Sequence, residues 1–267
     1  MSFKIPDFHI PGVFDWEKRK AQMNACMARG LESFSEQPQR SGHLTLACYG
    51  PSLKRTYRDI TGPVLSVSGA HDFLIEHGRT PDWHAIADPR EDNARMLKHA
   101  NDRTTYLLAS VCHPAVFDAL KGRKVLVWHL YTQSECKDWM RDADPHGVMV
   151  YGGSTVGLRC LEIAHALGFR ALDVHGMDSC FDSAEKQWAG EHTGKRHTVT
   201  YVQIGKHPRP FATSALMIQQ AREMVNFIDT HEIKVRIRGD GMIAAMMKQI
   251  NRKQQDNRKS QPLQRAA

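Results

Sequence analysis

The sequence predicts an α/β fold with a Rossmann-like, doubly wound, mostly parallel sheet, an N-terminal helix and a C-terminal helical extension. Short apolar runs recur from His43 onward, at 43–49, 63–68, 84–88, 104–110, 125–130 and 171–175. They are nearly continuous rather than alternating, as in strands that are covered on both faces. Segments with helical spacing separate them, and strands that alternate with helices are typical of a parallel sheet. A chain of 267 residues with 41% hydrophobic residues is long enough to bury one large core.

The helical segments follow the same order along the chain. Residues 15–36 predict the N-terminal helix, and further helices are expected at 91–100, 114–120, 155–167, 212–231 and 242–250. The helix at 155–167 has the clearest apolar face, and Gly168 provides its end. Late strands are expected at 198–204 and 234–238. We therefore predict a helical segment at 1–42, a Rossmann-like domain at 43–250 and a tail at 251–267.

Composition and charge exclude several classes of protein. The sequence contains no run of about 18 apolar residues and begins without the apolar stretch of a signal peptide, so we expect a cytoplasmic protein without a membrane partner. The six cysteines lie 20 or more residues apart and form no CxxC pair, which indicates reduced thiols. Homo-oligomer formation stays open.

The tail carries most of the net charge of +7. Residues 251–267 hold five basic residues and one acid in a polar context, and such a segment is expected to be disordered. A basic tail can make weak contact with nucleic acid. The rest of the chain is close to neutral and offers no basic stripe, which argues against a dedicated nucleic-acid-binding protein.

Glycine and polar residues follow the predicted strands. In open α/β sheets, ligands bind at the carboxyl ends of the strands. The first two strands are followed by Gly50-Pro51-Ser52 and by Ser68-Gly69, and both turns can bring the backbone close to a phosphate. Asp88 ends the third strand, where it either binds a ligand or starts a turn before Pro89. An ordinary tight turn is the alternative for each.

Two further motifs complete the predicted site. Gly152-Gly153-Ser154-Thr155 precedes the clearest helix and offers either an anion site or an N-cap. Asp178 follows the strand at 171–175 and is predicted to be catalytic. Together with Asp88 it is predicted either to hold Mg²⁺ or to contact the donor. The polar stretch 181–196 is expected to be a lid, and its His192 is predicted to act as a general base; the alternative is a solvated histidine.

Taken together, the motifs resemble a known family. They are, in order, YGPSL (49–53), SGAHDFL (68–74), PDWHAIADPR (81–90), YGGSTVG (151–157), ALGF (166–169) and HGMDSCF (175–181). This set is similar to the MptE-like domain, which is named for the archaeal 6-hydroxymethylpterin diphosphokinase. The resemblance implies a Rossmann-like fold related to bacterial sialyltransferases. Relatives of the domain occur in motility-associated glycosylation factors and in phage genomes.

The resemblance also assigns roles to residues. It implies that the Gly50-Pro51-Ser52 and Gly-Gly-Ser turns hold nucleotide phosphates, that Asp178 lines the site, and that His192 matches the family's histidine. Two positions depart from the pattern, because Cys48 replaces the first glycine of GxGPS and Ser68 replaces the usual asparagine. Both departures put nucleotide binding in question.

Two classes of function follow. The first is a transferase with a nucleotide donor and a small-molecule acceptor. It moves either pyrophosphate from ATP to a hydroxymethyl group with Mg²⁺, or a sugar from a nucleotide sugar. The second is a non-catalytic module that binds a nucleotide or another ligand, or a phage-associated module, that kept the fold; the residues at 48 and 68 favour this class. The sequence names neither donor nor acceptor.

Overall fold

The computed structural model describes residues 15–183, 186–190, 198–230 and 233–260. Its strands are β1 (Glu32–Ser33), β2 (Leu44–Ala47), β3 (Val64–Val67), β4 (Trp83–Ile86), β5 (Thr105–Ala109), β6 (Val125–Leu130), β7 (Met149–Val150), β8 (Ala171–His175), β9 (Thr200–Val202), β10 (Phe211–Thr213) and β11 (Lys234–Ile237). Its α-helices are α1 (Trp16–Met27), α2 (Leu53–Thr56), α3 (Ala70–Glu76), α4 (Pro114–Ala119), α5 (Glu135–Ala143), α6 (Val156–Ala166), α7 (Ala215–Thr230) and α8 (Met242–Ser260). Two 3-10 helices, η1 (Tyr57–Asp59) and η2 (Glu91–Met96), complete the set in the described residues.

The central sheet is parallel in every described pairing, which confirms the predicted fold class. Its strand order is β1-β6-β5-β4-β3-β2-β8-β11, and β7 also pairs with β6. From β2 the chain moves outward through β3, β4, β5 and β6, and then returns to place β8 on the other side of β2. The order therefore reverses between β2 and β8, which makes their carboxyl ends the topological switch point of the sheet.

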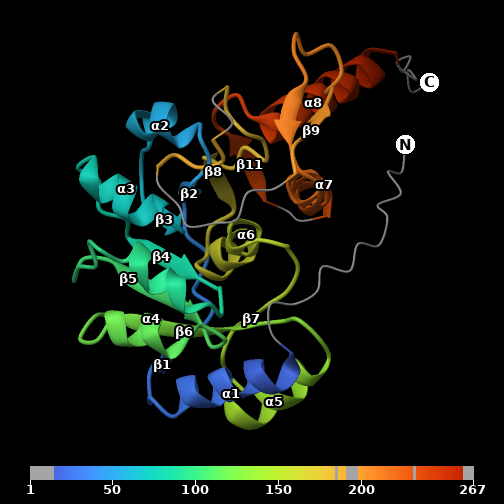
Figure 1. Ribbon diagram of the computed structural model, residues 1–267. Helices are drawn as coiled ribbons and strands as arrows, with labels where there is room; N and C mark the ends of the chain where they lie inside the picture. The colour runs from blue at the N-terminus through green and yellow to red at the C-terminus, as the bar shows by residue number, and fades with distance from the viewer. Residues whose placement is uncertain (1–14, 184–185, 191–197, 231–232, 261–267) are drawn as a thin grey trace.

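Helices cover both faces of this sheet. Figure 1 shows α2, α3 and α4 on one side and α6 with α7 on the other, while α1 and α5 lie together beside β1 and β6. Both faces of β2 and β3 are buried, as the continuous apolar runs predict. The small antiparallel pair of β9 and β10 stands apart from the central sheet.

The N-terminal boundary differs from the prediction. The helix ends at Met27, well short of the predicted 36, and Gly30 follows it with a positive φ of 62°. β1 then pairs with β6, so the sheet begins before His43. Phe34 is buried in the main core. Residues 15–42 are therefore part of the domain and not a separate helical segment.

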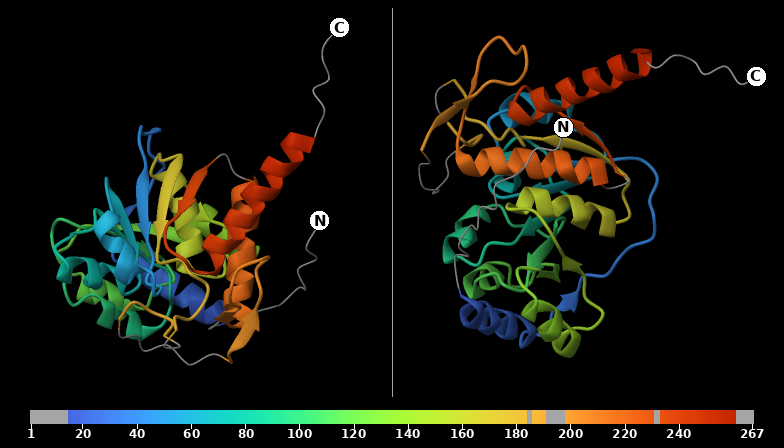
Figure 2. Two further views of the ribbon diagram at one scale, coloured as in Figure 1. Left: turned by 90° about the horizontal axis from the view of Figure 1, so that it is seen from above. Right: turned by 90° about the vertical axis from the view of Figure 1, so that its right-hand side faces the viewer.

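The tail also differs from the prediction. The last helix does not end at Ile250 but continues as α8 to Ser260, so that residues 251–260 are helical. Figure 2 shows the end of α8 extending beyond the sheet. The predicted helix at 91–100 is the shorter 3-10 helix η2. Among the described residues, no helix has both the length and the apolar character that crossing a membrane requires.

Candidate functional site

Two adjoining cavities lie at the carboxyl edge of the sheet. The larger, which we call the cleft, has a volume of about 1120 Å³ and is bordered by the segments after β4, β5 and β6 and by α1, α6 and α7. The smaller cavity, about 180 Å³, lies at the switch point between the ends of β2, β3 and β8. Ser68, Thr155 and Val156 line both, so the two cavities meet there. This is the edge at which the sequence places the site.

The Gly50-Pro51-Ser52 turn uses its amides inside the protein. The Gly50 amide donates to the carbonyl of Gly176 at 2.7 Å, and the Ser52 amide donates to Asp178 Oδ2 at 2.8 Å. A side chain on Gly50 would overlap the Gly176 carbonyl, because the two turns pack backbone against backbone. Gly50 lines the smaller cavity, whereas Pro51 and Ser52 are buried and line neither. The amides expected to bind phosphate therefore join β2 to β8.

The two acids predicted to share a metal ion lie at different cavities. Asp178 lines the smaller cavity, is 6% exposed, and has a pKa that burial raises. Asp88 lines the cleft, where its carboxylate pairs with Arg90 and also accepts from the Arg90 amide at 2.9 Å. Each carboxylate has a donor in the protein and the two line different cavities, and the shared magnesium site stays a prediction. In the parts of the chain that the structure describes, no group of three or more His, Cys, Asp or Glu side chains is arranged to hold a metal ion.

Strained backbone marks the junction of the two cavities. Ser68 has a φ of +52° and Ser179 a φ of +51°, a region that L-residues with side chains seldom adopt. Ser68 lines both cavities and Ser179 lines the smaller one. Strained residues of this kind cluster at ligand sites. Gly69, in contrast, is buried beneath the Tyr49 ring and lines neither cavity.

The Gly152-Gly153-Ser154-Thr155 turn already holds an anion from the protein. Gly152 and Gly153 have φ values of +60° and +76°, which explains the two glycines. The amide and the hydroxyl of Ser154 both donate to Glu223 Oε2 from α7, at 2.8 and 2.7 Å. Thr155 is the N-cap of α6 and accepts from the Leu158 amide. All four line the cleft, but Glu223 occupies the Ser154 donors that were predicted to bind phosphate.

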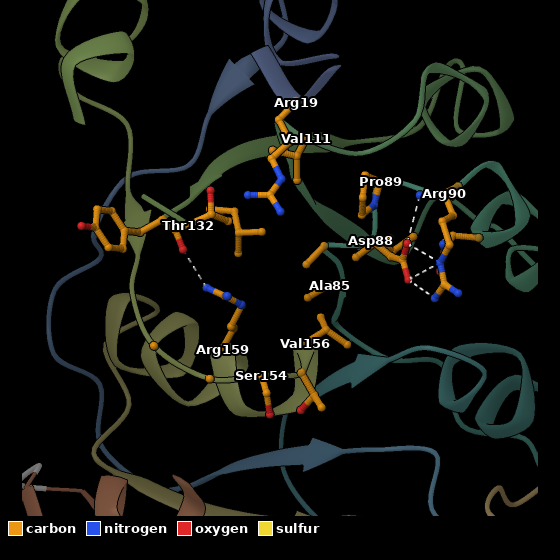
Figure 3. Close-up of a pocket in the computed structure, with 18 of the residues that line it drawn as sticks. Arg19, Ala85, Asp88, Pro89, Arg90, Val111, Thr132, Ser154, Val156 and Arg159 are labelled. Carbon is orange, nitrogen blue, oxygen red and sulfur yellow. Dashed lines mark hydrogen bonds and ion pairs between the residues drawn. The ribbon is translucent and has the colours of Figure 1, made fainter. Parts of the chain in front are cut away.

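Two arginines in the cleft were not predicted from the sequence. Figure 3 shows Arg159 of α6 and Arg19 of α1 extending into the same cavity. Arg159 Nη1 donates to the Tyr131 carbonyl at 3.4 Å, and burial lowers the Arg159 pKa to about 10, so it stays charged at neutral pH. Neither arginine forms an ion pair with a carboxylate in the described part of the chain, although the negative charges of Glu162 and Glu223 act to raise the Arg159 pKa. The available signal was Arg159 itself, a charge within the mostly apolar sequence of α6.

An aromatic pair stands at the rim of the cleft. The rings of Tyr131 and Tyr151 lie 4.9 Å apart between centroids, and Lys137 Nζ is 5.4 and 5.5 Å from the two ring centroids. Tyr131 lines the cleft, and Tyr151 is 42% exposed beside Gly152. Exposed aromatic rings are surfaces on which bases and sugars stack. The rim therefore offers an apolar platform next to the charged interior.

The predicted lid is only partly described. His192 lies in 191–197, outside the described residues, so its predicted role stays a prediction. The preceding part of the stretch lies over the smaller cavity, where Gln187 and Trp188 line the wall and the Ala189 amide donates to the Tyr49 carbonyl at 2.8 Å. The described part of the segment after β8 thus borders the smaller cavity, and the lid stays a prediction.

The cysteine at the first departure position has a packing role. Cys48 is 7% exposed, and burial raises its pKa. A side chain on Gly157, in the first turn of α6, would lie 3.0 Å from Cys48 Sγ. The thiol therefore fills the space between β2 and α6, where a glycine would leave a gap.

A solved glycosyltransferase structure has a similar fold. The Maf glycosyltransferase from Magnetospirillum magneticum AMB-1 matches with a TM-score of 0.59 and 13% identity; the match covers 90% of this chain and 42% of that chain. The chain thus spans less than half of that enzyme, and the likeness shows the fold alone.

Two sialyltransferase structures match less well. The sialyltransferase CstII from Campylobacter jejuni, in complex with cytidine-5'-monophosphate, matches with a TM-score of 0.43 and 15% identity, over 74% of this chain and 80% of that chain. A mammalian sialyltransferase matches with a TM-score of 0.46 and 10% identity, over 85% of this chain and 87% of that chain. No protein with a curated description matches the sequence.

The family model described as "6-hydroxymethylpterin diphosphokinase MptE-like" matches residues 24–184. This match spans more than half of the 267 residues and includes β2 to β8, the strands that border both cavities. It also includes the Gly50, Ser68, Asp88, Gly152 and Asp178 turns. The chain belongs to the MptE-like family.

Proposed function

We propose that the chain is a transferase that binds a nucleotide donor in the cleft and transfers a group from it to a small-molecule acceptor. The observation that carries the proposal is Arg159, a half-buried guanidinium that lies in the cleft and forms no ion pair in the described part of the chain. The fork of Arg159 donates to a backbone carbonyl rather than to a carboxylate, and phosphate is the anion that a guanidinium fork fits best. Family membership supports nucleotide use, and the cleft lies at the edge where such folds bind ligands.

Between the two reactions of this class, the site favours sugar transfer. Pyrophosphate transfer from ATP relies on Mg²⁺ to neutralise the phosphates. Because Asp88 and Asp178 lie at different cavities and have protein donors, we derive no step through a metal ion. In sugar transfer, the acceptor oxygen bonds to the anomeric carbon while the bond from that carbon to the phosphate oxygen breaks. The nucleotide leaves with the electron pair, and the Arg159 guanidinium stabilises its growing negative charge.

The donor is identified by ligand-dependent thermal unfolding. We expect one nucleotide among ATP, CMP, UDP and GDP to raise the melting temperature, since a ligand at 100 times its Kd stabilises a protein by about 2.7 kcal/mol. Each nucleotide is measured with and without Mg²⁺; a rise that needs no Mg²⁺ supports sugar transfer, and one that needs it supports the diphosphokinase reaction. Arg159→Ala should abolish the rise. If no nucleotide shifts the wild-type protein, the proposal is wrong and the non-catalytic alternative gains.

The acceptor proton requires a base, and we propose His192 for this role. Its position in the segment after β8 and Asp178 supports the proposal, because the described part of that segment borders the smaller cavity. General-base catalysis typically contributes about 10²- to 10⁴-fold in rate. With the identified donor, His192→Ala should lower kcat by about that factor and leave nucleotide affinity unchanged. His197→Ala is the control; a loss confined to that variant would assign the base to His197 instead.

A further inference from the structure

Helix α1 forms one wall of the cleft although most of it precedes the residues that match the family. The family match begins at residue 24, whereas Asp15, Trp16 and Arg19 line the cleft. Figure 3 shows the Arg19 side chain entering the cavity from a different element than Arg159. The cleft is therefore completed by a segment to which the family pattern assigns no role.

Contacts with three other segments fix the position of α1. Gln22 Nε2 donates to the Pro89 carbonyl at 3.1 Å, close to the acid at the cleft wall. Asn24 accepts from Trp139 of α5 at 2.7 Å, and Arg29, just after the helix, pairs with Asp118 of α4 at 2.8 Å. With these anchors along its length, α1 holds Arg19 at a defined place over the cleft. A preorganised side chain loses less entropy when a ligand binds.

The acidic residues of the cleft each accept from another donor, although the charge of Glu223 also acts on Arg159 and raises its pKa. Asp15 caps α1 by accepting from the Lys18 amide, Asp88 pairs with Arg90, and Glu223 accepts from Ser154. None of them forms an ion pair with Arg19 or Arg159 in the described structure.

Two guanidinium groups that share a half-buried cavity repel each other. Burial lowers the pKa of Arg159 to about 10; the negative charges of Glu162 and Glu223 act against this, and the positive charge of Arg19 adds to it. The free protein therefore keeps two cations in one cleft, and neither forms an ion pair with a carboxylate in the described structure. A bound anion relieves this repulsion and gains charge-assisted hydrogen bonds from both forks.

We propose that Arg19 and Arg159 form one oxyanion subsite, which binds the phosphate groups of the nucleotide and which α1 completes. This inference rests on the proposed function for its ligand. Guanidinium groups from two elements grip a phosphate chain from two directions, and Trp16 and Tyr131 flank them with aromatic surface. Docking of α1 onto the domain is thus a requirement for donor binding.

The test measures affinity in the intact protein, by calorimetry, for inorganic pyrophosphate and for the nucleotide that stabilises it. Arg19→Ala should weaken both by about 10- to 100-fold, as expected for loss of a hydrogen-bonded charge contact. Alanine favours helix, so this variant should fold as the wild type does. Lys20→Ala is the matched control, because it removes the same charge from the next, exposed residue of α1, which does not line the cleft.

The double variant tests whether the two arginines share one anion. If they do, the loss in Arg19→Ala/Arg159→Ala differs from the combined losses of the single variants, because removal of one partner changes what the other contributes. Additive losses, or an Arg19→Ala variant that binds as Lys20→Ala does, would overturn the inference.

The probes separate this inference from the proposed function. Nucleotide binding that needs Arg159 but not Arg19 leaves the function standing and overturns the subsite. Binding of pyrophosphate through both arginines, without binding of any nucleotide, supports the subsite and overturns the function. Failure of the wild-type protein to bind either probe overturns both.

Discussion

Two regions lie at the same edge of the sheet: the junction of β2, β8 and β11, and the cleft beside α1 and α6. They differ in whether their polar groups are paired within the protein. At the junction, the Gly50 and Ser52 amides are bonded to Gly176 and Asp178, and Asp173 of β8 pairs with two arginines at β11. In the cleft, Arg159 has no carboxylate partner in the described structure.

This difference shows what glycine and charge contribute in each region. Glycines at the junction are required because backbones touch there, so the junction is structural. The cleft holds two arginines that form no ion pair in the described structure, although the charges of Glu162 and Glu223 act on Arg159. A ligand that binds there stabilises the folded protein. Substitutions at the junction should therefore alter unfolding, whereas substitutions in the cleft should alter binding.

The largest effect is expected from Gly176→Ala. Gly176 has a φ of +66°, and an added Cβ would overlap the carbonyl oxygen of Cys48. Backbone on both sides of the overlap cannot move without separating β2 from β8. The free energy of unfolding should fall by at least about 3 kcal/mol, measured by denaturant titration.

Gly78→Ala is the matched control for this substitution. Gly78 also has a positive φ, +81°, but no atom lies within 4 Å of its added Cβ. Its cost should be limited to the conformational strain of about 1–2 kcal/mol. Equal losses in the two variants would show that close packing of the junction contributes nothing.

A smaller effect is expected from Asp173→Asn, and it depends on pH. Burial acts to raise the pKa of Asp173, but hydrogen bonds from Arg236 and Arg238 outweigh burial and lower it from 3.8 to about 2. Because the folded pKa is the lower one, the ion pairs stabilise the protein above pH 3.8, and this contribution is lost as the pH falls towards 2. Asp173→Asn should cost about 2 kcal/mol at pH 7.

Unfolding measured between pH 2 and pH 7 checks this expectation. The difference between wild type and Asp173→Asn should shrink as the pH falls through the titration range. Asp118→Asn removes the partner of Arg29 in a pair whose aspartate is 67% exposed, and its cost should stay below about 1 kcal/mol. A pH-independent difference for Asp173→Asn would show that the ion pairs do not stabilise the junction.

The elements that could be predicted from the sequence are those with a local signal. The central strands were recognisable because burial on both faces leaves a continuous apolar run, as in Leu44–Ala47 and Val64–Val67. β1 was missed because two residues, Glu32 and Ser33, carry no periodic signal, and α8 was cut short because its last turns are polar.

The site was predictable in place but not in its contacts. Turns after the strands indicated the carboxyl edge, where the two cavities lie, since strand ends and glycines are local signals. Which donors are free is decided by distant residues: Glu223 reaches Ser154 across 69 positions, and Asp178 reaches Ser52 across 126. Arg19 of α1 reaches the cleft only through tertiary packing. Local patterns carry no information about such pairs.

The smallest effect, and the one that joins the two regions, is expected at Ser68. This residue lies where the cavities meet and has a φ of +52°, which glycine adopts readily and asparagine tolerates better than serine does. Ser68→Gly should therefore raise the free energy of unfolding by up to about 1 kcal/mol.

Ser68→Asn should give part of that gain in stability and also add a side-chain amide near the cavities. One added hydrogen bond of about 1 kcal/mol corresponds to roughly fivefold tighter nucleotide binding, which calorimetry resolves. Ser68→Gly separates the two contributions because it relieves strain without offering an amide. If Ser68→Asn stabilises the protein but weakens nucleotide binding, the residue faces the ligand and asparagine blocks it. If neither variant changes binding, the nucleotide does not contact residue 68, where the two cavities meet.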